Sequence, residues 1–222
     1  ATRSGEIDME LTAEAAAFAD RQLARLVRGP IKVTAPVALS GNSLKAETIE
    51  ISSGALGGTA VLAYDLESAA LDLGFKAFLA SQALLPPDLA AKAGNTIELS
   101  GRLAGTPGDL AFSGVQLVSG IATAKLDGTL TGNELSASLT GDIPSLAAFD
   151  NAVEGRLNLT ATLAGPLEKL TIDSAATAER IVAAGRALEN VDVTFDGELD
   201  PAAPRGTMKA SFALDGENIT AS

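Results

Sequence analysis

Alternation of apolar and polar residues with a period of two is the feature that most limits how this chain can fold. The segment "IKVTAPVAL" places Ile31, Val33 and Val37 on one side, and "RLNLTATLAG" places Leu157 and Leu159 on one side. Successive side chains of a β-strand point to opposite faces, whereas a helical pattern repeats every 3.6 residues. The chain is therefore predicted to be mainly β, with strands that have one apolar and one polar face.

Short turn signals separate these alternating runs. They are "SGN" at 40–42, "GTPGD" at 105–109, "GN" at 132–133, and "DG" at 196–197 and 215–216. Strands spaced by about 8–12 residues with such turns are typical of antiparallel sheets. A parallel sheet would need a crossover of a dozen or more residues after each strand, and few helices of that length are expected.

Three segments break the alternation and are predicted to be helical. Thr12–Val27 has a capping threonine, Phe78–Gly94 contains a Pro86-Pro87 break and ends on glycine, and Asp142–Ala152 contains one or two turns from Pro144. Each segment comes just before an alternating strand, so the helices are expected to recur in step with the strands.

The alternating pattern is repeated along the chain. Ile31–Gly54 matches Ile97–Gly120, 66 positions later, and the segment from Leu157 matches that from Ile97 at an offset of 60, with Gly165 opposite Gly105. We interpret residues 1–222 as one elongated repetitive domain with approximate repeats 12–77, 78–141 and 142–222. Chance similarity among strands rich in Ala, Leu, Gly and Thr is the alternative.

The composition argues against several classes of function. The formal net charge of -12 is unfavourable for nucleic acid, and the chain has no Cys and no His. Without histidine the commonest general base and metal ligand are missing, so we expect neither an enzyme nor a metal or other cofactor. The "SSGALGGTA" segment lacks the Gly-Lys-Ser/Thr of a phosphate loop, and Gly57-Gly58 is interpreted as a bend or bulge.

The carboxylates are expected to be solvated. Most fall at outward strand positions or in turns: Asp65, Asp72, Glu98, Asp192 and Asp196. The sequence contains no apolar run of about 18 residues and no signal peptide. Because it starts without an initiator Met and stops within a strand pair, we expect it to be a segment of a longer protein.

A sheet with one apolar face must cover that face with a second sheet, by closing on itself, or with a foreign apolar ligand. The inward positions carry many small residues, including Ala35, Gly101, Ala161 and Ala210. Two packed sheets are about 10 Å apart, and residues this small would leave much of the space between them unfilled. The pattern favours an open trough, and a β-sandwich is the alternative.

Several phrases resemble the repetitive periplasmic region of the TamB family. These are "LTATLAGPLEKLTIDSAATAERI", "VAAGRALENVDVTFDGELDPAAPRGTMKASFALDG" and "LARLVRGPIKVTAPVALSG". The family's style is a strand of the type G-x-L-x-L-x-x-x-L-x-G, a turn with proline, and then L-x-x-L-x-I/L/V. Gly155–Gly165, Pro166, Leu170 and Ile172 fit this style. TamB is the inner-membrane subunit of the translocation and assembly module, within the AsmA-like group related to bridge-like lipid-transfer proteins.

The resemblance implies a fold, a place and a role. The fold would be a long curled antiparallel sheet, the β-taco, with short helices at its rim. The parent protein would be anchored in the inner membrane of a Gram-negative bacterium, cross the periplasm, and engage TamA, an outer-membrane protein of the Omp85 type. Its trough would conduct phospholipid acyl chains and support outer-membrane biogenesis.

Two alternative functions are open. The chain could be a scaffold that supports assembly or secretion of outer-membrane proteins, such as autotransporters, by strand pairing. It could also be a plain β-sandwich spacer or adhesin. For the lipid conduit, the predicted groove-lining residues are Ile31, Val33, Val37, Leu39, Leu44, Ile49, Ile51, Leu71, Leu73, Phe75, Ile97, Leu99, Leu103, Leu110, Phe112, Leu157, Leu159, Leu163, Leu170, Ile172, Val191, Val193, Phe195 and Phe212.

Overall fold

The computed structural model describes residues 4–14, 30–199 and 205–222. Contacts divide the chain into two compact units, Ala1–Gly120 and Ile121–Ser222, and the boundary falls within the expected second repeat. Strands make up 74% of the structure, which confirms the prediction of a mainly β chain.

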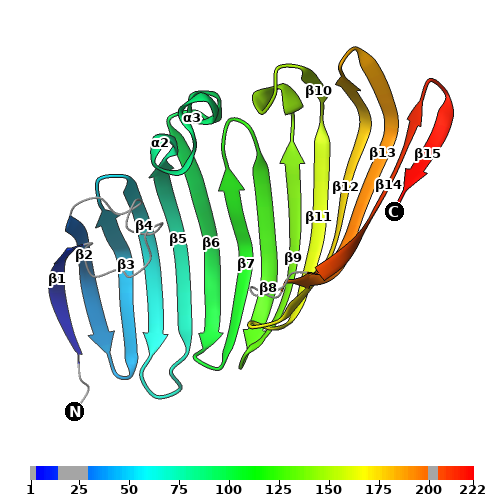
Figure 1. Ribbon diagram of the computed structural model, residues 1–222. Coiled ribbons are helices and arrows are strands. Elements are labelled where there is room, and N and C mark those ends of the chain that lie inside the picture. Colours follow the sequence, from blue (N-terminus) through cyan, green and yellow to red (C-terminus); the bar gives the residue numbers. More distant parts are fainter. Residues whose placement is uncertain (1–3, 15–29, 200–204) are drawn as a thin grey trace. The chain divides into compact units, whose positions relative to one another are not determined.

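The described strands of the first unit form an antiparallel sheet in which each strand pairs with the next one in sequence. In this unit β1 pairs only with β2 among the described residues, so the sheet has an open edge there (Figure 1). The strands are β1 (Ser4–Glu14), β2 (Pro30–Ser40), β3 (Ser43–Ser52), β4 (Leu56–Asp65), β5 (Leu71–Ala80), β6 (Thr96–Thr106) and β7 (Asp109–Val118).

The second unit has the same construction. Its strands follow the order β8-β9-β11-β12-β13-β14-β15, and the short β10 pairs with β12 beyond the end of β11. The strands are β8 (Thr123–Thr131), β9 (Glu134–Ile143), β10 (Val153–Gly155), β11 (Leu157–Pro166), β12 (Leu170–Ala183), β13 (Arg186–Leu199), β14 (Arg205–Leu214) and β15 (Glu217–Ala221). The sheet of each unit is twisted and curved (Figure 1), so the predicted curled, open antiparallel fold is confirmed.

The strand register gives each sheet one apolar face and one polar face. Directly paired residues of an antiparallel sheet lie on the same face. In the first unit Leu99 pairs with Ala77 and Leu117, and in the second unit Leu159 pairs with Gly141 and Ala176. We call the face that carries Leu99 or Leu159 the apolar face of its unit, and the opposite one the polar face.

Each unit has a single layer of strands. Among the described residues no second sheet packs on either face, and the buried side chains on strands are small or few. Ala60, Ala137 and Ala161 are buried because larger neighbours on the apolar face flank them. The β-sandwich alternative is therefore wrong within each unit.

A β-bulge lies in each of the segments Ile31–Gly54 and Ile97–Gly120. The register of β3 shifts between Ala46 and Ile49, and the register of β7 shifts between Ser113 and Gln116, one position later in its segment. An extra residue in one strand restores the apolar side chains to the same face after the shift.

The predicted bend or bulge at Gly57-Gly58 is wrong. Both residues pair in unbroken register, Gly58 with Ile51 and Ala77. A Cβ on Gly58 would lie 2.7 Å from the carbonyl oxygen of Lys76. The glycine therefore permits close approach of β5 instead of bending β4.

The described helices fall within the predicted breaks, but both predicted segments begin too early, because Phe78–Ala80 belongs to β5 and residues 142–143 belong to β9. Phe78–Gly94 contains α2 (Ser81–Leu84) and α3 (Pro87–Ala93), which together lie at one end of β5 and β6 (Figure 1). A 3-10 helix, η2 (Leu146–Ala148), lies within Asp142–Ala152. Among the described residues, no helix has the length and hydrophobicity needed to cross a bilayer.

The helix predicted over Thr12–Val27 is only partly covered by the structure. Its first residues, 12–14, belong to β1, where Thr12 pairs with Lys32, so the prediction is wrong there. Residues 15–27 lie outside the described residues.

Candidate functional site

The apolar face of each unit is the candidate functional site. In the first unit it contains every residue predicted there, namely Ile31, Val33, Val37, Leu39, Leu44, Ile49, Ile51, Leu71, Leu73, Phe75, Ile97, Leu99, Leu103, Leu110 and Phe112. In the second unit it contains Leu157, Leu159, Leu163, Leu170, Ile172, Val191, Val193, Phe195 and Phe212. Whether these residues contact lipid stays a prediction.

Sequence reasoning missed further members of the apolar face. On β1 they are Ile7, Met9 and Leu11, which pair with Val37, Ala35 and Val33. On β8 and β9 they are Leu126, Leu130, Leu135 and Leu139. The same period-two signal is present in "EIDMEL", "KLDGTL" and "ELSASL", so these residues could have been found from the sequence.

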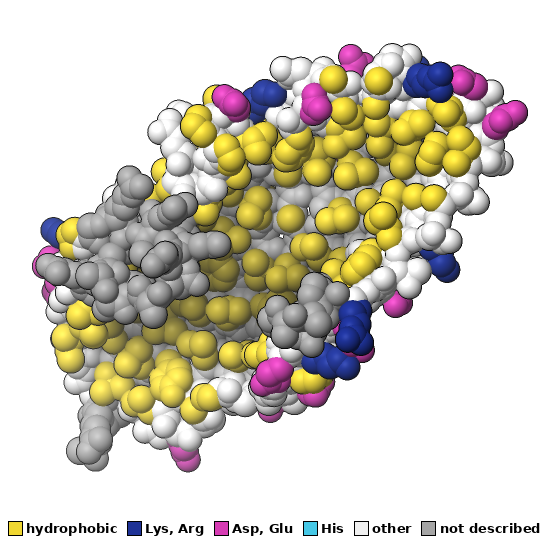
Figure 2. Space-filling model, in the orientation of Figure 1, with side chains coloured by type: hydrophobic (Ala, Val, Ile, Leu, Met, Phe, Trp, Pro, Cys, Tyr) yellow, Lys and Arg dark blue, Asp and Glu magenta, His cyan; other side chains and the backbone are white. Residues whose placement is uncertain are grey.

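The apolar faces exclude charge. On β2 to β7, and again on β8, β9 and β11, the described side chains of this face include no Asp, Glu, Lys or Arg. Tyr64 lies at the end of β4, and the Ser174 hydroxyl donates to the Phe195 carbonyl oxygen at 3.4 Å. Hydrophobic side chains gather over the strands of each unit (Figure 2).

Exposure alternates along β2 and β11 even though each sheet is one layer thick. In β2 every apolar-face residue is half-buried and every polar-face residue is exposed, and β11 shows the same alternation with Ala161 buried. Within β11, Ala161 lies beside its larger partners Leu139 and Ser174 on the same face, which reduces its exposure. The apolar face is thus partly sheltered before any ligand binds.

Two phenylalanines lie against the backbone of neighbouring strands. A Cβ on Gly101 would be 3.2 Å from the Phe75 ring, and a Cβ on Gly206 would be 2.5 Å from the Phe195 ring. Glycine at these cross-strand positions leaves space for an aromatic ring, an arrangement that stabilises glycine-containing strands. The rings of Phe75 and Phe195 therefore lie over the backbone of the adjacent strands.

The polar faces carry the ion pairs. Arg102 donates to Asp72 through Nε at 2.6 Å and Nη2 at 2.5 Å, and Arg156 Nε donates to Asp142 at 2.6 Å. Lys76 Nζ lies 3.4 Å from Glu98 Oε2. The predicted carboxylates Asp65, Asp72, Glu98, Asp192 and Asp196 all lie on polar faces, as expected.

Acid is expected to weaken the first unit through Asp72. Its hydrogen bonds to Arg102 hold the pKa of the Asp72 carboxyl below its ordinary value of 3.8. A lowered folded-state pKa contributes stability that is complete above the unfolded pKa and is lost as pH falls through the folded pKa. An Asp72→Asn variant should therefore show a shallower loss of stability below pH 3.8 in urea titrations. An Asp173→Asn variant is the control, and an equal change in both variants would contradict this role of Asp72.

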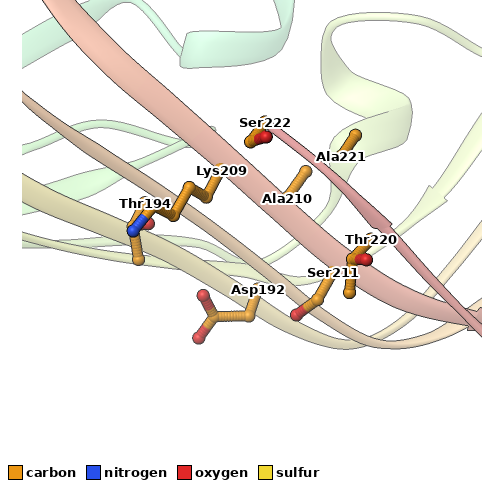
Figure 3. A pocket seen from close by; sticks show the side chains of 8 residues that line it. All are labelled: Asp192, Thr194, Lys209, Ala210, Ser211, Thr220, Ala221 and Ser222. Atoms are coloured by element: carbon orange, nitrogen blue, oxygen red, sulfur yellow. The ribbon is translucent and has the colours of Figure 1, made fainter.

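The described surface also has a hollow of about 380 Å³ at the end of β15. Asp192, Thr194, Lys209, Ser211 and Thr220 contribute polar side chains to its lining, and Lys209 extends toward Thr194 (Figure 3). Sequence reasoning did not predict this hollow. Within the described residues, no group of three or more acidic side chains is placed to hold a metal.

Comparisons with protein-family models, curated proteins and solved structures find no match to this chain. The chemistry of the two faces therefore carries the functional argument.

Proposed function

We propose that this chain is a segment of a periplasmic lipid-transfer protein, and that the apolar face of each unit holds phospholipid acyl chains. One observation carries the proposal: an extended apolar surface without charge runs across several strands, and no second layer of described residues covers it. A charge-free surface of this kind fits a ligand that is long and apolar and has no hydrogen-bonding groups of its own.

The energetics of an acyl chain require a long, continuous surface. Transfer of each CH₂ from water to an apolar environment is worth about 0.8 kcal/mol, so a chain of about 16 carbons costs on the order of 12 kcal/mol to expose. Adjacent strands are about 4.8 Å apart, so four strands advance the apolar face by about 19 Å. Repetition of such strands lengthens the path without any interruption by charge.

The cellular part of the proposal rests on the resemblance to the TamB family. The parent protein would be anchored in the inner membrane, cross the periplasm and engage TamA, and the lipid would pass toward the outer membrane. The polar faces, with their Asp72–Arg102 and Asp142–Arg156 pairs, would remain in water.

Photo-crosslinking tests the proposal with matched neighbours. A photoreactive phenylalanine analogue is placed at Leu99 or Leu159 on the apolar face, or at Ser100 or Thr160 on the polar face, of the parent protein in cells. We expect phospholipid adducts in mass spectra from the Leu99 and Leu159 variants only. Adducts of equal yield at all four positions, or none at the two leucines of a folded and abundant protein, would contradict the proposal.

A further inference from the structure

The chain leaves the sheet between β5 and β6 at a helical segment, Ser81–Gly94, that contains α2 and α3 (Figure 1). We call this segment the β5–β6 excursion. Ile97, the second residue of β6, is 5% exposed, and it is the only buried side chain larger than alanine among the described apolar residues of the first unit. The enclosed part of the described apolar face of this unit thus lies next to the excursion.

The cover over Ile97 lies on the apolar side of the sheet. On the polar face its neighbours are open to solvent, because Thr96 is exposed and the Glu98 side chain is 46% exposed. On the apolar face Leu79 has a paired residue on each side, Leu56 and Ile97, and is still only half-buried. Neighbouring strands alone therefore do not account for the burial of Ile97.

Helix α3 supplies the cover. Its residues Ala90 and Ala93 are three positions apart, so they lie on one side of the helix, and both are buried. The Gly120 N–H, just beyond β7, donates to the Ala93 carbonyl oxygen at 2.7 Å. A Cβ on Gly120 would lie 2.8 Å from the Lys92 carbonyl oxygen, so glycine permits this close approach. The excursion thus leaves β5, reaches the end of β7, and crosses the end of β6 where Ile97 lies.

Ser81 ties the two ends of the excursion together. Its hydroxyl donates to the Gly94 carbonyl oxygen, and its N–H donates to the Asn95 carbonyl oxygen at 3.1 Å. Ser81 has no exposed surface and is the one buried polar residue among those that the structure describes. An alanine at this position would leave the Gly94 carbonyl oxygen without that partner, which is unfavourable where water is excluded. The hydroxyl therefore holds the base of the excursion closed.

On its other side the excursion has less support. A second hollow, of about 720 Å³, lies between α2 and the turn that joins β3 to β4, and Gly54 lines it from the turn and Leu84 from α2. Leu84 is exposed. The hydrogen bonds of Ser81 and Gly120 are therefore important for keeping α3 over Ile97.

We infer that the β5–β6 excursion bounds the lipid path in the first unit, and that Ser81 is the positioning residue that holds it there. Acyl chains then contact Leu99 and Leu103, which are only half-buried, and do not reach Ile97. Ile97 is thereby assigned to the boundary of the path instead of its floor. This inference rests on the proposed lipid function, and it adds which part of the apolar face lipid can occupy.

Single cysteines test the inference, because the chain has no cysteine of its own. Ile97→Cys and Leu99→Cys are each treated with a small water-soluble maleimide, and separately with a phospholipid that carries a maleimide at the end of one acyl chain. We expect both reagents to label Leu99→Cys rapidly and Ile97→Cys slowly. Equal rates at the two cysteines with either reagent would overturn the inference.

Loss of the Ser81 hydroxyl should expose the cysteine at position 97. Adding Ser81→Ala to Ile97→Cys should raise its labelling rate on the order of tenfold, the factor that corresponds to one unpaired buried hydrogen-bonding group. The rate at Leu99→Cys should not change, which shows that the sheet stays folded. Gly120→Ala, whose Cβ would crowd the Lys92 carbonyl oxygen, should have the same effect and is the second variant if Ser81→Ala does not fold.

Ser53→Ala is the matched control. Ser53 also has a buried hydroxyl oxygen, just after β3, but that oxygen has no hydrogen-bond partner among the described residues. Its removal should leave the labelling rate at Ile97→Cys unchanged. Equal effects of Ser81→Ala and Ser53→Ala would overturn the role of Ser81.

The two reagents separate this inference from the proposed function. If the acyl maleimide labels neither cysteine while the water-soluble reagent labels Leu99→Cys, the lipid function is contradicted, and the inference with it. If the acyl maleimide labels Ile97→Cys and Leu99→Cys alike, only the boundary is overturned and the lipid function stands.

Discussion

A Leu159→Arg variant is expected to bind acyl chains along the second unit on the order of a hundredfold more weakly than the natural chain. Arginine in the centre of a hydrocarbon environment costs about 2.5–3.5 kcal/mol, and each 1.4 kcal/mol is a factor of ten in affinity. Leu159 lies within β11 and pairs with Gly141 and Ala176, which have no side chain and a single methyl group and so cannot cover a guanidinium group. Titration with a pyrene-labelled phospholipid measures the change.

The adjacent residue provides the matched control. Thr160 pairs with Thr140 and Ala175 on the polar face, so Thr160→Arg adds the same charge to the same strand but outside the apolar path. It should bind lipid as the natural chain does. Circular dichroism establishes that both variants retain their strands, and Leu159→Asn serves as a milder variant if the arginine prevents folding. Unchanged binding by a folded Leu159→Arg or Leu159→Asn variant would contradict the conduit for this unit.

The division of residues between two faces could be predicted from local sequence because it depends only on the period of two. Leu157, Leu159 and Leu163 share a face in any extended strand, and the structure places them together. The break between α2 and α3 was also local, since Pro86-Pro87 stops one helix and begins the next. Local rules therefore account for most of the predicted site.

Features set by pairing between strands could not be predicted in the same way. Leu44 and Ile49 have opposite parity, and only the register of β3 with β2 and β4 produces the bulge that returns both to the apolar face. Thr12 can cap a helix, but an eleven-residue register with β2 keeps it in β1. The preference of Thr12 for a helix cap is local, whereas pairing with β2 involves every residue of β1. The pairing between strands therefore decides the conformation of Thr12.

A Gly105→Ala variant is expected to lose about 3 kcal/mol of stability and about 10 °C in melting temperature. Gly105 is the penultimate residue of β6 and has φ of 137°, a conformation that residues with a side chain rarely adopt. A Cβ there would lie 1.9 Å from the carbonyl oxygen of Asp109, so the β6–β7 hairpin would have to open at its turn. Thermal and urea unfolding followed by circular dichroism measure the loss.

Two other glycines give a graded control series. Gly165 matches Gly105 in the predicted repeat and has φ of 110°, but its Cβ would lie 3.2 Å from the Lys169 carbonyl oxygen, so Gly165→Ala should cost less, about 1–2 kcal/mol. Gly74 has no neighbour within 4 Å of a Cβ, so Gly74→Ala should leave stability unchanged or raise it by up to about 1 kcal/mol. Equal losses of stability at all three positions would contradict the prediction, because the φ and the close carbonyl oxygen at Gly105 would then make no difference. A graded loss would mean that the positive φ shared by Gly105 and Gly165 has a cost in each hairpin, and that the closer carbonyl oxygen adds to it at Gly105.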